Sequence, residues 1–412
     1  MDLTGPVPRA RQTANPGAAE VRGLTFRRAA FRTLSDPDLM MTKFHARLSP
    51  GMSLLASALL ALCLGAGPAP VPDPSQQWEQ LMTGAMKSLR ANNVAEAVRQ
   101  SEEAVRLAGQ FGPQDTKLSR SQVLRAEVYM WEKKNDLAEQ TFQRAVASCE
   151  RAAGSNDVAL VHPLSSLANF YYFVVARYDL VAPLFQRILN IVQNAPQPNP
   201  RDVILWSRNL GLIYQQTGKY AQGEPLFKRA VALAEQSDAE WLPHELLTAA
   251  DFYRAWGKHD QAEALAKRAL AIREKALTPE GGIDAQLDVA VCLNGLGTNY
   301  LAWGKPDRAE AAYRRSLALV ETFMSADQAD LTPYLEGLAA ALRAQGKYEP
   351  AEPLYRRALA ITLKNVGAND PHAAALLEQY AGLLEDMKKP AEAKSFRERA
   401  AAIRRQNAAP PN

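Results

Sequence analysis

A small apolar residue recurs at a nearly constant interval along the chain, and the apolar positions around it recur with it. We call this residue the marker. It lies at Ala97, Ala138, Val181, Gly223, Ala262, Ala309, Ala351 and Ala393. Successive markers are 39 to 47 residues apart, and most intervals are 41 to 43 residues. A repeat period in this range predicts a solenoid, in which each unit buries its apolar face against its neighbours.

Large and small residues alternate at fixed distances from the marker. Aromatic residues lie nine residues before it (Tyr129, Tyr172, Tyr214, Tyr253 and Tyr300) and four residues after it (Phe142, Phe185, Phe227, Tyr313 and Tyr355). Mostly small residues lie twelve before it and seven after it. A small residue on one helix makes room for a ring on the next, so the pattern predicts packed helix pairs. In the fourth copy we expect helices at 202–217 and 220–236, with Gly218 in the turn.

These positions resemble the tetratricopeptide repeat, residue by residue, over about residues 78–405. The resemblance implies an all-α fold, a right-handed superhelical solenoid of about eight helix-turn-helix repeats. The units are longer than the usual 34 residues. The stretches 218–220, 346–348, 351–355 and 366–371 are similar instead to the longer repeats of the kinesin-light-chain type, here about 42 residues.

Residues 41–66 have the layout of a signal peptide. Lys43 and Arg47 precede an apolar run, Met52–Leu64, which is shorter than the roughly 20 residues that a spanning helix needs. We expect cleavage near Ala66 and export to the periplasm or the medium, with a bacterial envelope as the setting. The alternatives are a membrane anchor formed by residues 52–66 and lipidation of Cys63, which the preceding Leu does not favour.

The remaining segments outside the repeats are expected to lack regular structure. Residues 1–40 are expected to be a disordered leader; a start at Met41 would leave them untranslated, and a transit peptide is a further alternative. Residues 67–77 form a Pro-rich linker, and residues 406–412 are expected to be a disordered tail.

Charge argues against a nucleic-acid partner. Residues 1–50 contain 8 Lys/Arg against 4 acids, which leaves 40 basic and 40 acidic residues in the rest of the chain. A neutral solenoid has no basic stripe to follow a phosphate backbone. The expected membrane contact is therefore only through the N-terminal hydrophobic segment.

No catalytic constellation emerges from the motifs. The Gly-Lys pairs, such as Gly218-Lys219, lack the remaining residues of a phosphate-binding loop and are interpreted as turns. His244 and Glu245 begin a zinc-protease motif, but Thr248 stands where the second His is required. We therefore expect no enzyme activity, no cofactor, no metal and no small-molecule substrate.

The remaining interpretation is a protein-binding scaffold or adaptor. The family resemblance implies that the first helix of each unit lines a concave groove for a peptide or a partner helix. The expected groove residues are Trp131, Phe170, Phe173, Arg208, Gln215, Asp251, Arg254 and Asn294. Rings dominate the early copies and charges the later ones, which predicts a partner segment of mixed apolar and charged character. A self-associating structural or cell-envelope assembly protein is the alternative, and the sequence does not identify the partner.

Overall fold

The computed structural model describes residues 73–237, 240–277, 282–325, 328–365, 367 and 369–408. Sixteen α-helices and two short 3₁₀ helices occupy these residues, and none of them lies in a strand. The helices are α3 (Pro74–Arg90), α4 (Val94–Ala108), α5 (Lys117–Trp131), α6 (Asn135–Ala153), η1 (Val158–Leu160), α7 (Val161–Phe173), α8 (Tyr178–Gln193), α9 (Pro200–Gln216), α10 (Tyr220–Ser237), α11 (Leu242–Ala255), α12 (His259–Ala276), α13 (Gly282–Ala302), α14 (Pro306–Val320), η2 (Ala329–Leu331), α15 (Thr332–Ala344), α16 (Tyr348–Asn365), α17 (Pro371–Asp386) and α18 (Pro390–Ala408).

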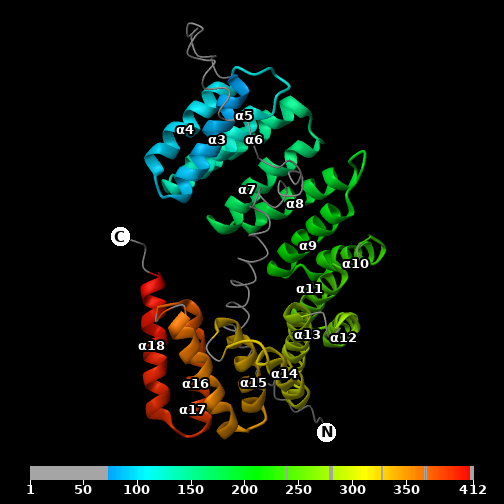
Figure 1. Ribbon diagram of the computed structural model, residues 1–412, viewed down its shortest axis with the longest axis vertical. Coiled ribbons are helices and arrows are strands. Elements are labelled where there is room, and N and C mark those ends of the chain that lie inside the picture. Colours follow the sequence, from blue (N-terminus) through cyan, green and yellow to red (C-terminus); the bar gives the residue numbers. More distant parts are fainter. Residues whose placement is uncertain are drawn as a thin grey trace, which may run out of the picture. The chain divides into compact units, whose positions relative to one another are not determined.

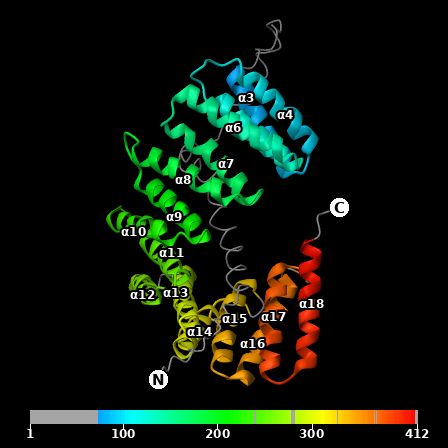
Figure 2. The same cartoon turned by 180° about the vertical axis from the view of Figure 1, so that it is seen from behind.

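The α-helices follow one another as eight pairs, one for each marker, so the predicted all-α repeat organisation is confirmed. Contacts divide the described chain into an N-terminal unit, residues 73–272, and a C-terminal unit, residues 273–408. The first helices α5, α7, α9, α15 and α17 each pack against the second helix of their own pair and of the pair before it. Figures 1 and 2 show this succession of paired helices from opposite sides.

Helix boundaries agree with the sequence pattern in the fourth copy and differ from it at the two ends of the repeat region. In the fourth copy, α9 ends at Gln216 and α10 begins at Tyr220, with Gly218 between them at φ +71°. Glycine suits this left-handed conformation because it has no Cβ to clash. The first helix begins at Pro74, four residues inside the expected linker, and α18 continues to Ala408. Asp73 accepts a hydrogen bond from the Ser75 N–H and so caps the start of α3. The expected leader and signal peptide, residues 1–66, lie outside the described residues.

The core is built from the predicted alternation of small and aromatic residues. The marker residues are fully buried, and so are the rings four residues after them, among them Phe142, Phe227 and Tyr355. Each ring fills the space that a small residue leaves on the neighbouring first helix. A methyl group on Gly297, for example, would come within 2.9 Å of the Tyr313 ring. Burial of this kind supplies most of the stability of a repeat protein, because each unit contacts only its neighbours.

A row of ion pairs joins consecutive second helices. An Arg six residues after the marker reaches a side chain twelve residues after the preceding marker. The pairs are Arg187–Glu150 (2.6 Å), Arg268–Glu235 (2.5 Å), Arg315–Glu274 (2.6 Å) and Arg357–Glu321. Between the third and fourth copies the acceptor is neutral, since Arg229 donates to Gln193 at 2.7 Å. Exposed pairs of this kind each contribute at most about 1 kcal/mol, but their repetition helps to fix the register of the stack.

The turn lysines also connect neighbouring pairs. Lys258, Lys347 and Lys389 reach Glu224, Glu310 and Glu352, each of which follows the marker of the preceding copy, at 3.5, 2.9 and 3.3 Å. The Gly-Lys turns at 257–258 and 346–347 and the Lys-Lys turn at 388–389 therefore each position a cation for a carboxylate of the preceding copy. This supports their interpretation as structural turns.

Candidate partner-binding surface

Trp131 and Phe173 are the last residues of α5 and α7, and their side chains are exposed to solvent. Their exposed fractions are 54% and 51%, which is unusual for large rings in this chain. The two helices are first helices of consecutive pairs and contact one another. Both rings therefore lie at the C-terminal ends of contacting first helices.

Phe170 does not belong to this surface, and its assignment to the groove was wrong. The side chain is 1% exposed and packs against Phe142 of the preceding second helix, with ring centroids 5.7 Å apart. The turn after α7 has one residue more than the turn after α5, which shifts the whole first helix relative to the marker. Phe170 therefore corresponds to Phe252 of α11, which is buried against Phe227 at 4.5 Å.

Arg208 was also expected on the surface, and the structure places it under the surface instead. Its guanidinium donates to Glu245 of α11 at 2.6 Å, and the two residues are 8% and 1% exposed. Desolvation raises the pKa of the Glu245 carboxyl, and the adjacent guanidinium counteracts this shift. The second carboxylate oxygen, Oε2, is buried and accepts no hydrogen bond from the described residues. The pair thus joins α9 to α11 and leaves little of Arg208 for a ligand.

Gln215 on α9 and Asp251 and Arg254 on α11 are partly exposed. Arg254 Nη2 donates to Asp251 Oδ1 at 3.0 Å, one helical turn away. Gln215 Oε1 is buried and has no hydrogen-bond donor within the described part of the chain. A buried acceptor without a donor costs free energy, so this amide can gain from a ligand N–H or from water.

Asn294 lies on α13, in the C-terminal unit. It is half-buried, and its Oδ1 is a buried acceptor that no described residue satisfies. The remaining predicted residues that stay accessible all belong to the N-terminal unit. We call these five residues, Trp131, Phe173, Gln215, Asp251 and Arg254, the first-helix face.

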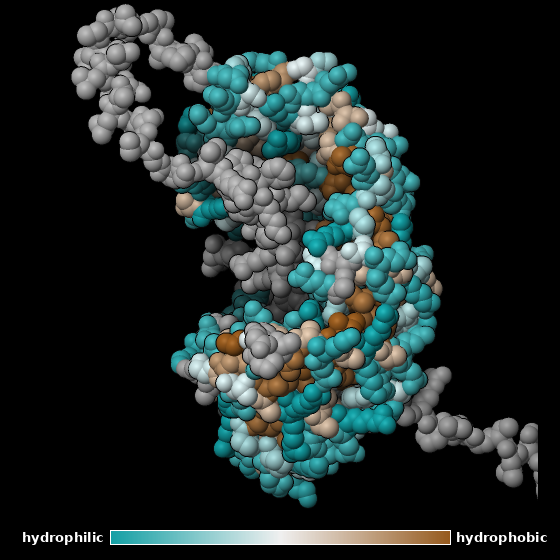
Figure 3. Space-filling model, turned by 45° about the vertical axis from the view of Figure 1, so that its right-hand side comes forward, coloured by the Kyte–Doolittle hydropathy of each residue, from teal (hydrophilic) through white to brown (hydrophobic). Residues whose placement is uncertain are grey.

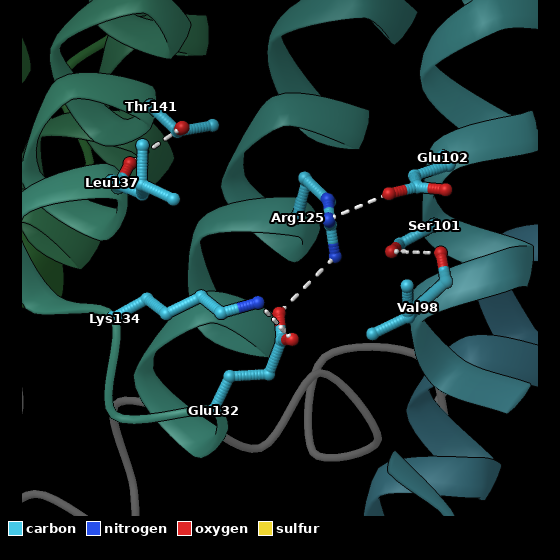
Figure 4. Close-up of polar contacts among 8 residues, drawn as sticks. All are labelled: Val98, Ser101, Glu102, Arg125, Glu132, Lys134, Leu137 and Thr141. Carbon is cyan, nitrogen blue, oxygen red and sulfur yellow. Dashed lines mark hydrogen bonds and ion pairs between the residues drawn. The ribbon is translucent and has the colours of Figure 1, made fainter. Parts of the chain in front are cut away.

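A network around Arg125 fixes the end of α5 next to Trp131. Arg125 donates to Glu102 of α4 at 2.7 Å and lies 3.7 Å from Glu132, which also pairs with Lys134 at 2.6 Å. Figure 4 shows Arg125 between the two carboxylates, with Lys134 approaching Glu132 from the following turn. The sequence offered no signal for this network, because Arg125 and Glu102 are 23 residues apart.

Glu127 adds a titratable group on the same helix. Desolvation raises its pKa to about 7, because the charged carboxylate loses hydration. Glu127 lies one helical turn before Trp131 on α5.

No three His, Cys, Asp or Glu side chains in the described ranges are grouped so that they could hold a metal ion. No helix in those ranges is both long enough and apolar enough to cross a membrane. On the face shown in Figure 3, hydrophobic residues form short patches between hydrophilic ones.

Comparisons with known proteins agree with the repeat pattern. The family model described as "Tetratricopeptide repeat" matches residues 202–275 and 331–406. No curated protein sequence matches the chain. Among solved structures, a tetratricopeptide repeat protein from Parabacteroides merdae is similar, with a TM-score of 0.47 and 16% identity over 74% of this chain and 99% of the other.

The kinesin light chain repeats of Podosopora anserina are also similar to this chain. Their TM-score is 0.43 with 20% identity, over 52% of this chain and 100% of the other. The family match covers parts of both units, and all eight helix pairs have the same succession of two helices around a marker. The chain therefore contains tetratricopeptide repeats, in its residues 202–275 and 331–406.

Proposed function

We propose that this protein is an interaction scaffold that binds a peptide or a partner helix along the first-helix face of its N-terminal unit. The observation that carries the proposal is the exposure of two rings, Trp131 and Phe173, at equivalent ends of neighbouring helices. Soluble proteins rarely leave neighbouring large rings exposed without a partner, and aromatic residues dominate the energetics of interfaces.

The chemistry of the face indicates what kind of segment would bind. The rings would bury apolar side chains of the partner, while Asp251 and Arg254 offer one charge of each sign further along the face. These groups suit an internal segment of mixed apolar and charged character.

Binding is tested with the full chain as bait in a pull-down from an envelope fraction, followed by titration of the identified partner. Phe173→Ala should weaken binding by about 1–2 kcal/mol or more, because the exposed ring would lose its burial. Arg254→Glu should mainly slow association and alter its salt dependence. Val158→Ala is the matched control, since Val158 is 53% exposed at the opposite end of the first helices. Unchanged affinity in Phe173→Ala would exclude this face as the binding site.

Export is the second part of the proposal and is supported by the layout of residues 41–66. A periplasmic or secreted protein would meet its partner outside the cytoplasm, and the apolar run at 52–66 would serve as an anchor if it were not cleaved. N-terminal sequencing of protein from a bacterial host should find a start near Gly67. A mature product that retains residues 41–66 would leave the anchor as the surviving alternative.

A further inference from the structure

Exposed apolar side chains are concentrated at one edge of the second and third copies. Eight large hydrophobic residues are exposed in the described part of the chain, and four of them lie here: Trp131, Leu137, Phe173 and Val174. All four lie at the ends of first helices or at the start of the following second helix. This edge, which we call the aromatic edge, therefore holds half of the exposed large hydrophobic residues of the described chain.

Two charges of opposite sign lie within the aromatic edge. Lys133 and Asp136 are exposed, and neither forms an ion pair with any described residue. The neighbouring cations differ in this respect, since Lys134 pairs with Glu132 and Arg177 pairs with Asp179. A cation and an anion next to the same rings are complementary in a two-fold interface, because the cation of each copy can then meet the anion of the other.

The shape of the edge is compatible with such an interface. A shallow hollow lined by residues 133–137 lies directly after Trp131 in the chain, so a projecting ring and a depression occur side by side. The turn contains Lys133 in the left-handed conformation, at φ +59°, and the ion pairs among Arg125, Glu132 and Lys134 tie its neighbouring residues together. A fixed projection and a fixed hollow lower the ordering cost of association.

We propose that the aromatic edge binds a second copy of this chain. In the proposed pair, Lys133 of each copy faces Asp136 of the other, and the rings of both copies are buried between these two contacts. Each half-exposed ring contributes on the order of 100 Å² of buried surface. The four rings alone fall well below the roughly 1,200 Å² of a standard interface, so the pair should be weak and should depend on concentration.

Self-association has a consequence for the proposed partner binding. The pair would cover Trp131 and Phe173, which also belong to the first-helix face, so a second copy and a partner would compete. This competition rests on the proposed function, whereas the pairing itself does not. Lys133 and Asp136 are outside the first-helix face, and changing them separates the two activities.

Sedimentation equilibrium of the full chain, at low to high micromolar concentration in one buffer, tests the proposal. Lys133→Asp and Asp136→Lys should each weaken the dimer about tenfold or more, because like charges then face each other twice. The double variant, Lys133→Asp with Asp136→Lys, should recover the affinity of the unmodified chain. Val158→Asp, at the opposite end of the first helices, should leave the dimer unchanged.

Three results would overturn the proposal. A chain that remains monomeric at every concentration has no such interface. A dimer that is insensitive to both single changes, or that the double variant does not restore, associates through another part of the chain. Loss of association in Val158→Asp to the same extent as in the edge variants would indicate a general effect on the fold. The dilute monomer of Lys133→Asp should still bind an identified partner. If it does not, Lys133 belongs to the partner-binding surface as well, and the two activities cannot be separated by this change.

Discussion

The ring of Phe227 on α10 occupies the space that a side chain on Gly211 of α9 would need. A Cβ built on Gly211 would lie 2.7 Å from Phe227 Cε2, closer than real Cβ contacts come. Phe227 is itself 1% exposed and contacts Phe252 of the next pair, so it has no free direction in which to move. The absence of a side chain at 211 is thus part of how the fourth and fifth copies pack.

Gly211→Leu should destabilise the protein by about 1–3 kcal/mol, because the added side chain overpacks a filled core. Gly112→Leu is the control, since a Cβ there meets no atom within 4 Å. Chemical denaturation measures the loss, and hydrogen exchange locates it. Exchange should rise mainly in α9, α10 and the adjoining helices, because a repeat stack transmits strain through neighbours. A uniform rise along the chain would contradict the repeat model.

Removal of one partner of the buried Arg208–Glu245 pair should be costly. Arg208→Met leaves the Glu245 carboxylate buried with no counter-charge, for which we expect a loss of about 3–5 kcal/mol. The double variant, Arg208→Met with Glu245→Leu, should recover most of that loss, because no buried charge remains. Equal destabilisation by the single and the double variant would mean that packing volume, rather than charge, is what the pair provides.

Gln193→Glu should strengthen the one neutral contact in the row of second-helix pairs. The change gives Arg229 a carboxylate in place of an amide, at the cost of the exposed hydrogen bond from Gln193 to Asn190. We expect a gain below about 1 kcal/mol at low ionic strength, and its disappearance in high salt. The same change in an Arg229→Ala background should give no gain. A gain there would come from a source other than the ion pair.

Glu127 should make stability depend on pH. Its pKa in the folded chain, about 7, lies above the ordinary value of 4.5, so the folded state binds the proton more tightly than the unfolded state. Stability is therefore lost as the pH rises from about 4.5 to about 7, by an amount of about 1–3 kcal/mol. Glu127→Gln removes this titration. In chemical denaturation, the variant should therefore have a larger free energy of unfolding than the unmodified chain above pH 7, and the same value near pH 4.5. The same advantage at both pH values would refute the assignment.

The sequence was sufficient for the fold because the repeat supplies eight independent copies of one packing rule. A marker such as Ala351 and a ring such as Tyr355 are buried for the same reason in every copy, so an error in one copy does not change the prediction. Turn glycines such as Gly346, at φ +75°, were recognisable for the same reason.

The surface was harder to predict, because exposure depends on details that the repeat does not fix. The turn after α7 has one additional residue, so every residue of α7 is one position further from the marker. One position corresponds to about 100° around the helix, which is enough to exchange a core position for a surface position. Phe170 was assigned wrongly for this reason. Arg208 was misplaced because its partner, Glu245, is 37 residues away in the chain, and the separation gives no sign of contact.

The neighbouring residues Phe170 and Phe173 should respond to mutation in opposite ways. Phe170→Ala removes a fully buried ring and leaves a cavity beside Phe142, so we expect a loss of about 3–5 kcal/mol in stability. Any partner binding by the protein that remains folded should be unchanged. Phe173→Ala removes a ring that is already half in water, so its melting temperature should change little, while partner binding and self-association both weaken. Thermal denaturation and titration of the two variants decide the matter, and a Phe173→Ala protein as unstable as Phe170→Ala would place both rings in the core.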